Sequence, residues 1–302
     1  MAKKPKTQTM AGRIIYYYQK NVGMHEIKAD PSCRLTHVII SAGHFINNQL
    51  ILNDNPATDE CFDSLWTDLK NLTQRNQHPI QFLFMLGGAG GAYRALFANY
   101  EACYAELVRF LRMHQAYLTG IDLDVEEPDI STDQVVRLVS DLRVDFPLPS
   151  FVITLAPTQE ALESPSGQCP FSSDLSYRAL QERLGANINW FNVQMYTEFS
   201  CERMALIVAN GFPAKDCVLG VLGSGSALAP ANVSTASWED LKTQVALTVK
   251  QYPDLGGVVV WEYFIAPPDP EKHLAWAQEM QRLMRQEPPV EPRPADWSCV
   301  ML

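Results

Sequence analysis

The sequence predicts a single-domain α/β protein with a (β/α)8 TIM barrel over residues 12–286. Short runs rich in β-branched and aromatic residues alternate with longer runs of helical periodicity, which is the pattern of parallel βα units. Eight strand-like runs fit a closed barrel better than a doubly wound sheet, which usually has fewer strands. The chain has 302 residues, enough for one such barrel, and no linker interrupts the alternation.

The predicted strands are apolar runs of five to ten residues, bounded by turn residues. They cover residues 13–18, 36–45, 80–86, 118–125, 151–156, 190–196, 217–221 and 257–263. Helical periodicity predicts helices over residues 59–75, 93–114, 132–144, 176–184, 201–210, 238–251 and 271–286. Residues 19–35 contain too few apolar residues to predict a helix. In such a barrel, the carboxyl ends of the strands carry the active site.

An acidic row ends the fourth predicted strand, where residues 119–126 read TGIDLDVE. Asp122, Asp124 and Glu126 are spaced two apart, so a strand places all three carboxyl groups on one face and aliphatic residues on the other. Burying three like charges together raises their pKa values, so at least one should hold a proton near neutral pH. This pattern favours acid/base chemistry.

Two other interpretations of the acidic row remain open at this point. The row could be the solvated face of an edge strand, although the apolar alternates and the following Pro128 indicate a covered strand. A site for a hard cation is also conceivable, but the stretch has no glycine-turned calcium loop. No histidine pair at helical spacing suggests zinc either. We therefore predict no metal ligands.

The row resembles the D-x-x-D-x-D-x-E signature of family 18 glycoside hydrolases, the chitinases and endo-β-N-acetylglucosaminidases. One position departs from it, because Thr119 stands where the family has its first Asp. On strand alternation Thr119 should point away from the three carboxyl groups.

A glycine-rich segment, FMLGGAGGAY over residues 84–93, follows the third predicted strand. It lacks both the G-K-[ST] ending and the G-x-G-x-x-G spacing of nucleotide sites. Gly87 and Gly88 would let the backbone approach a ligand closely. The segment is similar to the S-x-G-G turn of family 18 barrels, and most similar to the hevamine-like branch. Met85 stands at the family's usual Ser, which is a second departure.

Aromatic residues at the strand ends complete the predicted site. Gln194 and Tyr196 share one face of the sixth strand and match the family's Gln-x-Tyr, while Trp261 matches the tryptophan that forms the floor beneath the sugar ring. Tyr16 is predicted to line the same cleft. Taken alone, a strand-end tyrosine more often reflects amphipathic packing and a tryptophan a core position.

The resemblance implies an endo-acting hydrolase of β-1,4-linked N-acetylglucosamine glycans, such as chitin oligosaccharides, that acts with retention by substrate assistance. It implies that Glu126 is the acid and base, that Asp124 orients the substrate acetamide, that Asp122 supports Asp124, and that Tyr196 binds the acetamide oxygen. No cofactor is needed. The alternatives are an endo-β-N-acetylglucosaminidase acting on N-glycans, and a catalytically weak glycan-binding protein.

Composition limits the partners. The net charge of -10 and the pI near 5.1 argue against nucleic acid and against an electrostatic hold on anionic membranes, so we expect a neutral partner. The resemblance implies that this partner is a glycan containing N-acetylglucosamine, and we also expect a monomer. Seven cysteines without metal-ligand spacing indicate reduced thiols, and the N-terminus has no secretory signal. We therefore expect a cytoplasmic protein, or one that is translocated without a cleavable signal.

The two ends of the chain are predicted to be tails. Residues 1–11 should be a flexible tail, and residues 287–302 a proline-rich spacer. The last four residues, CVML, fit a C-a-a-X box, so Cys299 is a candidate for geranylgeranylation and membrane association. The missing polybasic run weakens this prediction, because one lipid chain usually needs a second signal for stable anchoring.

Overall fold

The computed structural model describes residues 12–20, 22–30, 35–74, 79–223, 237–269 and 271–288. Within these ranges, eight parallel strands close into a barrel, because β1 pairs with both β10 and β2. The barrel strands are β1 (Arg13–Tyr18), β2 (His37–Ile46), β5 (Gln81–Gly87), β6 (Leu118–Asp124), β7 (Val152–Leu155), β8 (Trp190–Gln194), β9 (Cys217–Leu222) and β10 (Gly257–Trp261). The predicted single (β/α)8 barrel is confirmed.

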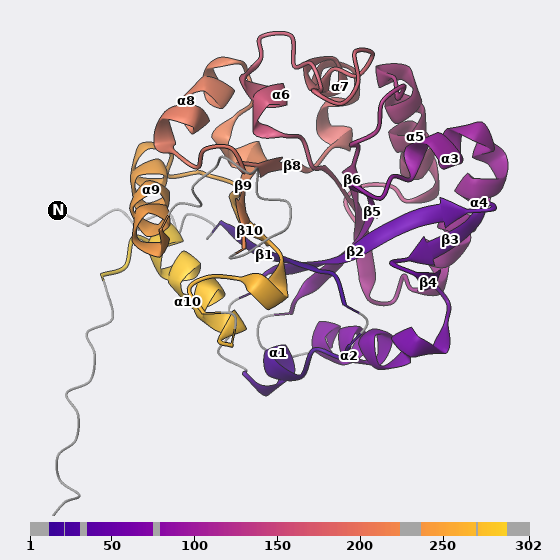
Figure 1. Cartoon of the computed structure of the whole chain (residues 1–302), viewed down its shortest axis with the longest axis horizontal. Helices are drawn as coiled ribbons and strands as arrows, with labels where there is room; N and C mark the ends of the chain where they lie inside the picture. Colours follow the sequence, from indigo (N-terminus) through magenta and orange to yellow (C-terminus); the bar gives the residue numbers. More distant parts are fainter. Residues whose placement is uncertain are drawn as a thin grey trace, which may run out of the picture.

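Helices form a ring outside the strands (Figure 1). They are α1 (His25–Ala29), α2 (Asp63–Thr73), α3 (Tyr93–Ala98), α4 (Tyr100–Met113), α5 (Thr132–Asp145), α6 (Gln159–Glu163), α7 (Tyr177–Leu184), α8 (Cys201–Ala209), α9 (Trp238–Gln251) and α10 (His273–Met284). Short 3-10 turns, η1 (Glu60–Phe62), η2 (Gly185–Asn187), η3 (Ala214–Asp216) and η4 (Tyr263–Ile265), connect some of them. Side chains that accept hydrogen bonds from backbone N–H groups cap the first turns of several helices. At α5, for example, Ser131 and Gln134 form a reciprocal capping box.

A hairpin that the sequence analysis did not predict extends one barrel strand. β2 continues into the antiparallel strands β3 (Gln49–Leu52) and β4 (Asn55–Pro56). Asn47 and Asn48 make the two-residue turn with φ of 51° and 64°, the left-handed conformation that asparagine tolerates best after glycine. This Asn-Asn pair between apolar runs was the available signal. The hairpin matters because its residues reach the carboxyl-end cleft.

Three helical details also differ from the prediction. The predicted helix over residues 93–114 is split into α3 and α4, because Asn99 leaves the helical conformation with φ -141° and ψ 65°. The five-residue helices α1 and α6 lie where no helix was predicted. Both are too short for periodicity to reveal them.

Two apolar layers hold the barrel together. The larger one lies between the outer faces of the strands and the helices. The smaller one fills the barrel interior midway along its axis and consists of Ile15, Tyr17, Ile39, Leu83, Met85, Trp190, Val218 and Val259. This inner layer separates the two ends of the barrel, so each end forms its own surface.

The predicted tail 1–11 and Cys299 lie outside the described residues. Among the residues that the structure describes, no helix combines the length and the apolar character that crossing a membrane requires.

Candidate active site

The acidic row lies inside the carboxyl end of the barrel, with the predicted alternation. Asp122 and Asp124 are 0% and 6% exposed and belong to β6, while Glu126 follows the strand and is partly exposed. The alternating Ile121 and Leu123 pack outward into the layer beneath the helices. The three carboxyl groups therefore run in order from the buried interior to the surface.

Asp122 is held by three donors. The hydroxyl of Tyr17 donates to Oδ2 at 2.8 Å, and the amide of Asn192 donates to Oδ1 at 2.9 Å. The hydroxyl of Thr154 also donates to Oδ1. Burial raises the pKa of Asp122, and these three hydrogen bonds oppose that rise by stabilising the anion. Asp122 is thus the member of the row best suited to carry negative charge.

Asp124 and Glu126 form a hydrogen-bonded pair. Burial raises the pKa of Asp124 well above its usual range, and the charges of Glu126 and Asp122 raise it further. Burial also raises the pKa of Glu126, while its hydrogen bonds with Gln194 and Asp124 oppose the rise. Gln194 Nε2 lies 3.1 Å from Asp124 Oδ1 and 3.0 Å from Glu126 Oε1. A buried pair of this kind retains a proton near neutral pH.

An open cleft of about 610 Å³ lies above this pair. The side chains of Tyr196 and Trp261 line it, together with Gln194 and the backbone of Gly87 and Gly88. His44, Asn53 and Asp54, from β2 and the hairpin, form another part of its wall. The ring of Trp261 packs against that of the inward-facing Tyr17, with ring centroids 5.1 Å apart.

The glycine-rich segment is joined to the end of β6. Gly88 N donates to the carbonyl of Asp124 at 2.8 Å. A Cβ on Gly87, whose φ is +102°, would lie 2.1 Å from that same carbonyl oxygen. Only glycine allows this approach, which brings the backbone of the β5 loop against the acidic row.

Glu127 forms a second connection between these two segments. Its Oε1 accepts from the backbone N–H groups of Ala92 and Tyr93, both at 2.5 Å, and its Oε2 accepts from Arg94 N at 3.0 Å. A carboxylate is stabilising at the unpaired N–H groups that begin a helix. Because Glu127 is bonded directly to Glu126 in the chain, this contact fixes the backbone that carries Glu126.

The prediction that Tyr16 lines the glycan cleft is wrong. Tyr16 is fully buried on the outer side of the barrel, where its hydroxyl donates to His273 O and accepts from Ala277 N at 3.2 Å. Its ring packs against Trp276 of α10. The adjacent Tyr17 faces inward instead, because consecutive strand residues point to opposite faces.

The three donors to Asp122 were not predicted from the sequence. Asn192 shares its strand face with Gln194, so the alternation along β8 was an available signal for it. Thr154 likewise lies on an inward position of β7. The run of three tyrosines in β1 gave no sign that Tyr17 is the one that faces inward and donates to Asp122.

The two departures from the family pattern occupy different places. Thr119 lies near the start of β6, where its hydroxyl lies 3.4 Å from Phe82 O, away from the cleft. Met85 is 1% exposed, belongs to the inner apolar layer and contributes to the cleft wall. Met85 is therefore the departure that lies beside the acidic row.

A closed barrel with a buried acidic row beneath a carboxyl-end cleft forms an enzyme-like site suited to acid/base chemistry, and comparisons with known proteins give its family. Residues 13–243 match the glycosyl hydrolases family 18. A fungal endo-β-N-acetylglucosaminidase of that family is 31% identical, with a TM-score of 0.79 over 91% of this chain and 98% of its own. A chitinase from Aspergillus fumigatus is 32% identical, with a TM-score of 0.74 over 85% and 94% of the two chains. The chain therefore belongs to glycoside hydrolase family 18.

More distant structures share the fold. A family 18 chitinase from Pseudoalteromonas aurantia is 19% identical, with a TM-score of 0.68 over 90% of this chain and 99% of its own. No curated protein sequence matches this chain. Across the described ranges, no group of three or more His, Cys, Asp or Glu side chains has the arrangement of a metal site.

Proposed function

We propose that this protein is an endo-acting hydrolase that cleaves β-1,4-linked N-acetylglucosamine glycans with retention, using the substrate's own acetamide as the nucleophile. The observation that carries the proposal is the pair of Asp124 and Glu126, two hydrogen-bonded carboxyl groups with raised pKa values at the base of an open cleft. Raised pKa values favour the protonated forms of both carboxyl groups, so Glu126 can deliver a proton to a leaving group while Asp124 keeps its own.

Glu126 is the general acid. It is the member of the row that reaches the surface of the cleft, so a glycosidic oxygen can approach it. Its proton moves to that oxygen as the bond from the oxygen to C1 breaks. The resulting carboxylate then takes a proton from the water that attacks C1, while the bond between C1 and the acetamide oxygen breaks. This step restores the acid for the next cycle and returns the acetamide to its original form.

The acetamide oxygen attacks C1 and forms an oxazolinium ion, so no enzyme carboxylate becomes bonded to carbon. Asp124 orients the acetamide N–H, and the negative charge of Asp122 keeps Asp124 protonated. The hydroxyl of Tyr196 donates to the acetamide oxygen. Burial and the nearby carboxylates raise the pKa of Tyr196, so this hydroxyl keeps its proton at every working pH.

Trp261 provides the floor of the subsite. It lines the same cleft as Glu126 and Tyr196, and its position against Tyr17 fixes the tilt of the indole. An indole face suits the apolar side of a pyranose ring, because both surfaces lose contact with water when they stack.

Chitin oligosaccharides are the substrates we favour, since the cleft is open and no large inserted domain covers it within the described ranges, as in the hevamine-like branch. The core of N-linked glycans contains the same bond and is the second candidate. The similarity to a fungal endo-β-N-acetylglucosaminidase over 98% of that chain supports it.

One experiment separates these substrates. Chitotetraose and a high-mannose glycopeptide are incubated with the protein, and the products are identified by mass spectrometry, with Glu126→Gln as the inactive control. We expect chitotetraose to be cleaved internally. Cleavage of the glycopeptide alone would transfer the assignment to N-glycans. Binding of both without cleavage of either would contradict a hydrolase and favour a glycan-binding protein.

A monomeric state, a cytoplasmic location and a geranylgeranyl group on Cys299 stay predictions. The CVML ending is what supports the lipid. The intact mass of the protein purified from eukaryotic cells, compared with that of Cys299→Ser, tests it. Equal masses, apart from the substitution itself, would rule the lipid out.

A further inference from the structure

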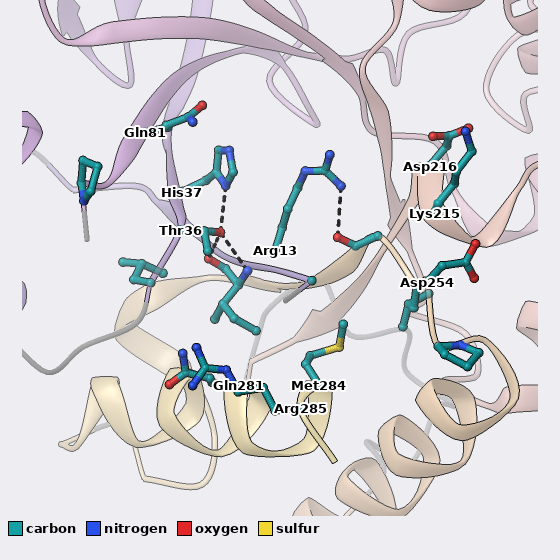
Figure 2. A pocket seen from close by; sticks show the side chains of 17 residues that line it. Arg13, Thr36, His37, Gln81, Lys215, Asp216, Asp254, Gln281, Met284 and Arg285 are labelled. Atoms are coloured by element: carbon teal, nitrogen blue, oxygen red, sulfur yellow. Dashed lines mark hydrogen bonds between the residues drawn. The ribbon is translucent and has the colours of Figure 1, made fainter. Parts of the chain in front are cut away.

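A second cavity, of about 740 Å³, lies at the amino ends of the barrel strands, opposite the acidic row. The first residues of β1, β2 and β5, the segments before β9 and β10, and the end of α10 form its wall. Arg13 and His37 lie in its middle (Figure 2). Its volume is in the range of small-molecule sites, and it has no place in the proposed hydrolysis.

Arg13 places in this cavity a cation with few hydrogen-bond partners among the described residues. Its guanidinium stacks over the ring of Trp190, 4.1 Å from the centroid, and Nη1 donates to Gly256 O at 3.1 Å. A guanidinium has five N–H groups, so this single side-chain bond leaves most of them without a partner among the described residues. Burial lowers the pKa of Arg13, and Asp216 only partly restores it.

His37 beside it supplies no positive charge. The hydroxyl of Thr36 donates to Ile14 O at 2.9 Å, so the 2.8 Å contact between Thr36 Oγ1 and His37 Nδ1 requires Nδ1 to carry the proton. Burial, together with the charge of Arg13, lowers the pKa of His37 to about 3. The imidazole is therefore neutral at physiological pH, and Arg13 is the charged group at the centre of the cavity.

The rest of the wall suits an amphipathic anion. Lys215 and Arg285 add two cations at the rim, against the carboxylates of Asp216 and Asp254. Lys215 and the two aspartates lie on one side of the cavity, and Arg285 lies on the other with Gln281 and Met284 of α10 (Figure 2). Arg285 lies 3.7 Å from Glu287, so its charge is partly neutralised. Ile14, Leu35, Pro79, Pro253, Leu255 and Met284 contribute apolar surface.

We propose that this cavity binds a small organic oxyanion, a carboxylate or phosphate ester with an apolar body, whose oxygens accept from Arg13. A guanidinium presents paired N–H groups in the geometry that carboxylate and phosphate oxygens accept. Lys215 adds charge from the rim, and the apolar wall receives the body of the ligand. This site is separate from the glycan cleft, with the inner apolar layer between them.

Binding is measured on the full chain by calorimetry at constant ionic strength, with benzoate and phenyl phosphate as probes and benzyl alcohol as the neutral control. We expect one saturable site for at least one of the two anions, and none for the alcohol. Comparing the anions shows which oxyanion is preferred. In parallel, the indole N–H signal of Trp190, assigned with Trp190→Phe, should shift with the same saturation, because Arg13 stacks on that ring.

Arg13→Met should weaken binding at least tenfold. Arg137→Met is the matched control, because Arg137 also stacks on an aromatic ring, 3.7 Å from the centroid of Tyr100, but is paired with Glu101 and lies outside the cavity. If Arg13→Met does not fold, Lys215→Met, at the rim, should weaken binding severalfold. Failure of both anions to saturate the wild type, equal binding of the alcohol, or binding indifferent to these cavity substitutions would overturn the proposal.

Discussion

The two ends of this barrel bury ionisable groups in opposite ways. At the carboxyl end, Asp122, Asp124 and Glu126 crowd together, and their pKa values rise, so the native state binds protons. At the amino end, Arg13 remains a cation, and burial holds His37 in its neutral form. The same desolvation therefore adds protons at one end and removes them at the other, because the groups differ in which form is charged.

A short series of contacts, one stacking contact followed by two hydrogen bonds, lies between the two ends. Arg13 stacks on Trp190, whose Nε1 donates to Asn192 Oδ1 at 2.9 Å, and the amide of Asn192 donates to Asp122 at 2.9 Å. β8 supplies both middle members on one face. One strand therefore supports two different electrostatic environments, with the buried amide of Asn192 between them.

The largest expected effect is at the outermost acid. Glu126→Gln keeps the shape of the side chain and its bond to Gln194, but it removes the proton that the leaving oxygen needs. Turnover should fall by about 10²-fold to 10⁴-fold, the range that general acid catalysis supplies. Initial rates on chitotetraose, or on the glycopeptide if that proves to be the substrate, measure the loss. Binding of that substrate by calorimetry should persist, and full activity would exclude Glu126 as the acid.

Asp124→Asn tests the raised pKa in the middle of the row. Turnover should fall about 10²-fold or more, since the group that orients the acetamide changes. The native pKa of Asp124 lies above its unfolded value, so the wild type loses stability as pH rises toward the native pKa. The variant lacks this loss. Its free energy of unfolding, compared with that of the wild type, should therefore be more favourable at pH 8 than at pH 5. Urea unfolding at both pH values measures this, and the opposite trend would contradict a buried protonated Asp124.

His37→Gln tests the amino end, where the sign is reversed. The pKa of His37 falls from 6.5 to about 3, so between those values the unfolded state binds a proton that the native state does not. Wild-type stability should therefore fall on acidification by up to roughly 1.4 kcal/mol per pH unit from this group. The variant should fall less steeply between pH 6.5 and pH 4. Urea unfolding at several pH values measures the free energy of unfolding of both proteins. If that free energy changed with pH by the same amount in both, His37 would not be held neutral.

Glu127 gives an intermediate effect, because it acts through its neighbour. Glu127→Ala removes the acceptor for the first N–H groups of α3 and frees the backbone of Glu126. We expect kcat to fall about tenfold, equivalent to about 1.4 kcal/mol, with a smaller change in KM. Glu127→Gln should recover part of the loss, since its amide oxygen can still accept. If Glu127→Ala lowered only the melting temperature, Glu127 would be merely structural.

The smallest effect distinguishes two adjacent tyrosines. Tyr16→Phe loses hydrogen bonds to α10 and should lower the free energy of unfolding by about 1 kcal/mol, without changing kcat/KM. Tyr17→Phe loses a donor to Asp122, so the acid limb of the pH–rate profile should move to higher pH. If Tyr16→Phe changed kcat/KM as much as Tyr17→Phe does, Tyr16 would contribute to the cleft after all.

The sequence allowed the barrel and the acidic row to be predicted because both depend on local alternation. β1 and the row of Asp122, Asp124 and Glu126 follow from strand periodicity alone. The run of three tyrosines in β1 shows the limit. Because the three residues are identical, the sequence does not show which of them faces the barrel interior. The closure of the barrel determines this orientation.

The other features that were missed depend on contacts between distant segments. Glu127 caps a helix 34 residues earlier in the chain, at Tyr93 N. The amino-end cavity draws Arg13, His37 and Lys215 from three separate segments, and no residue pattern within one segment reveals it. The hairpin wall of the cleft had a local signal at Asn47 and Asn48, but only the structure shows that it faces the substrate side.

The most direct test of the proton-holding acidic row is a ¹³C NMR titration of carboxyl-labelled protein, with Asp124 assigned by comparison with Asp124→Asn. If the account is correct, the Asp124 carboxyl carbon keeps the chemical shift of a protonated acid at pH 7. If that signal instead titrates near pH 4, as an exposed aspartate does, Asp124 holds no proton at neutral pH, and the proposed role of the Asp124 and Glu126 pair is contradicted.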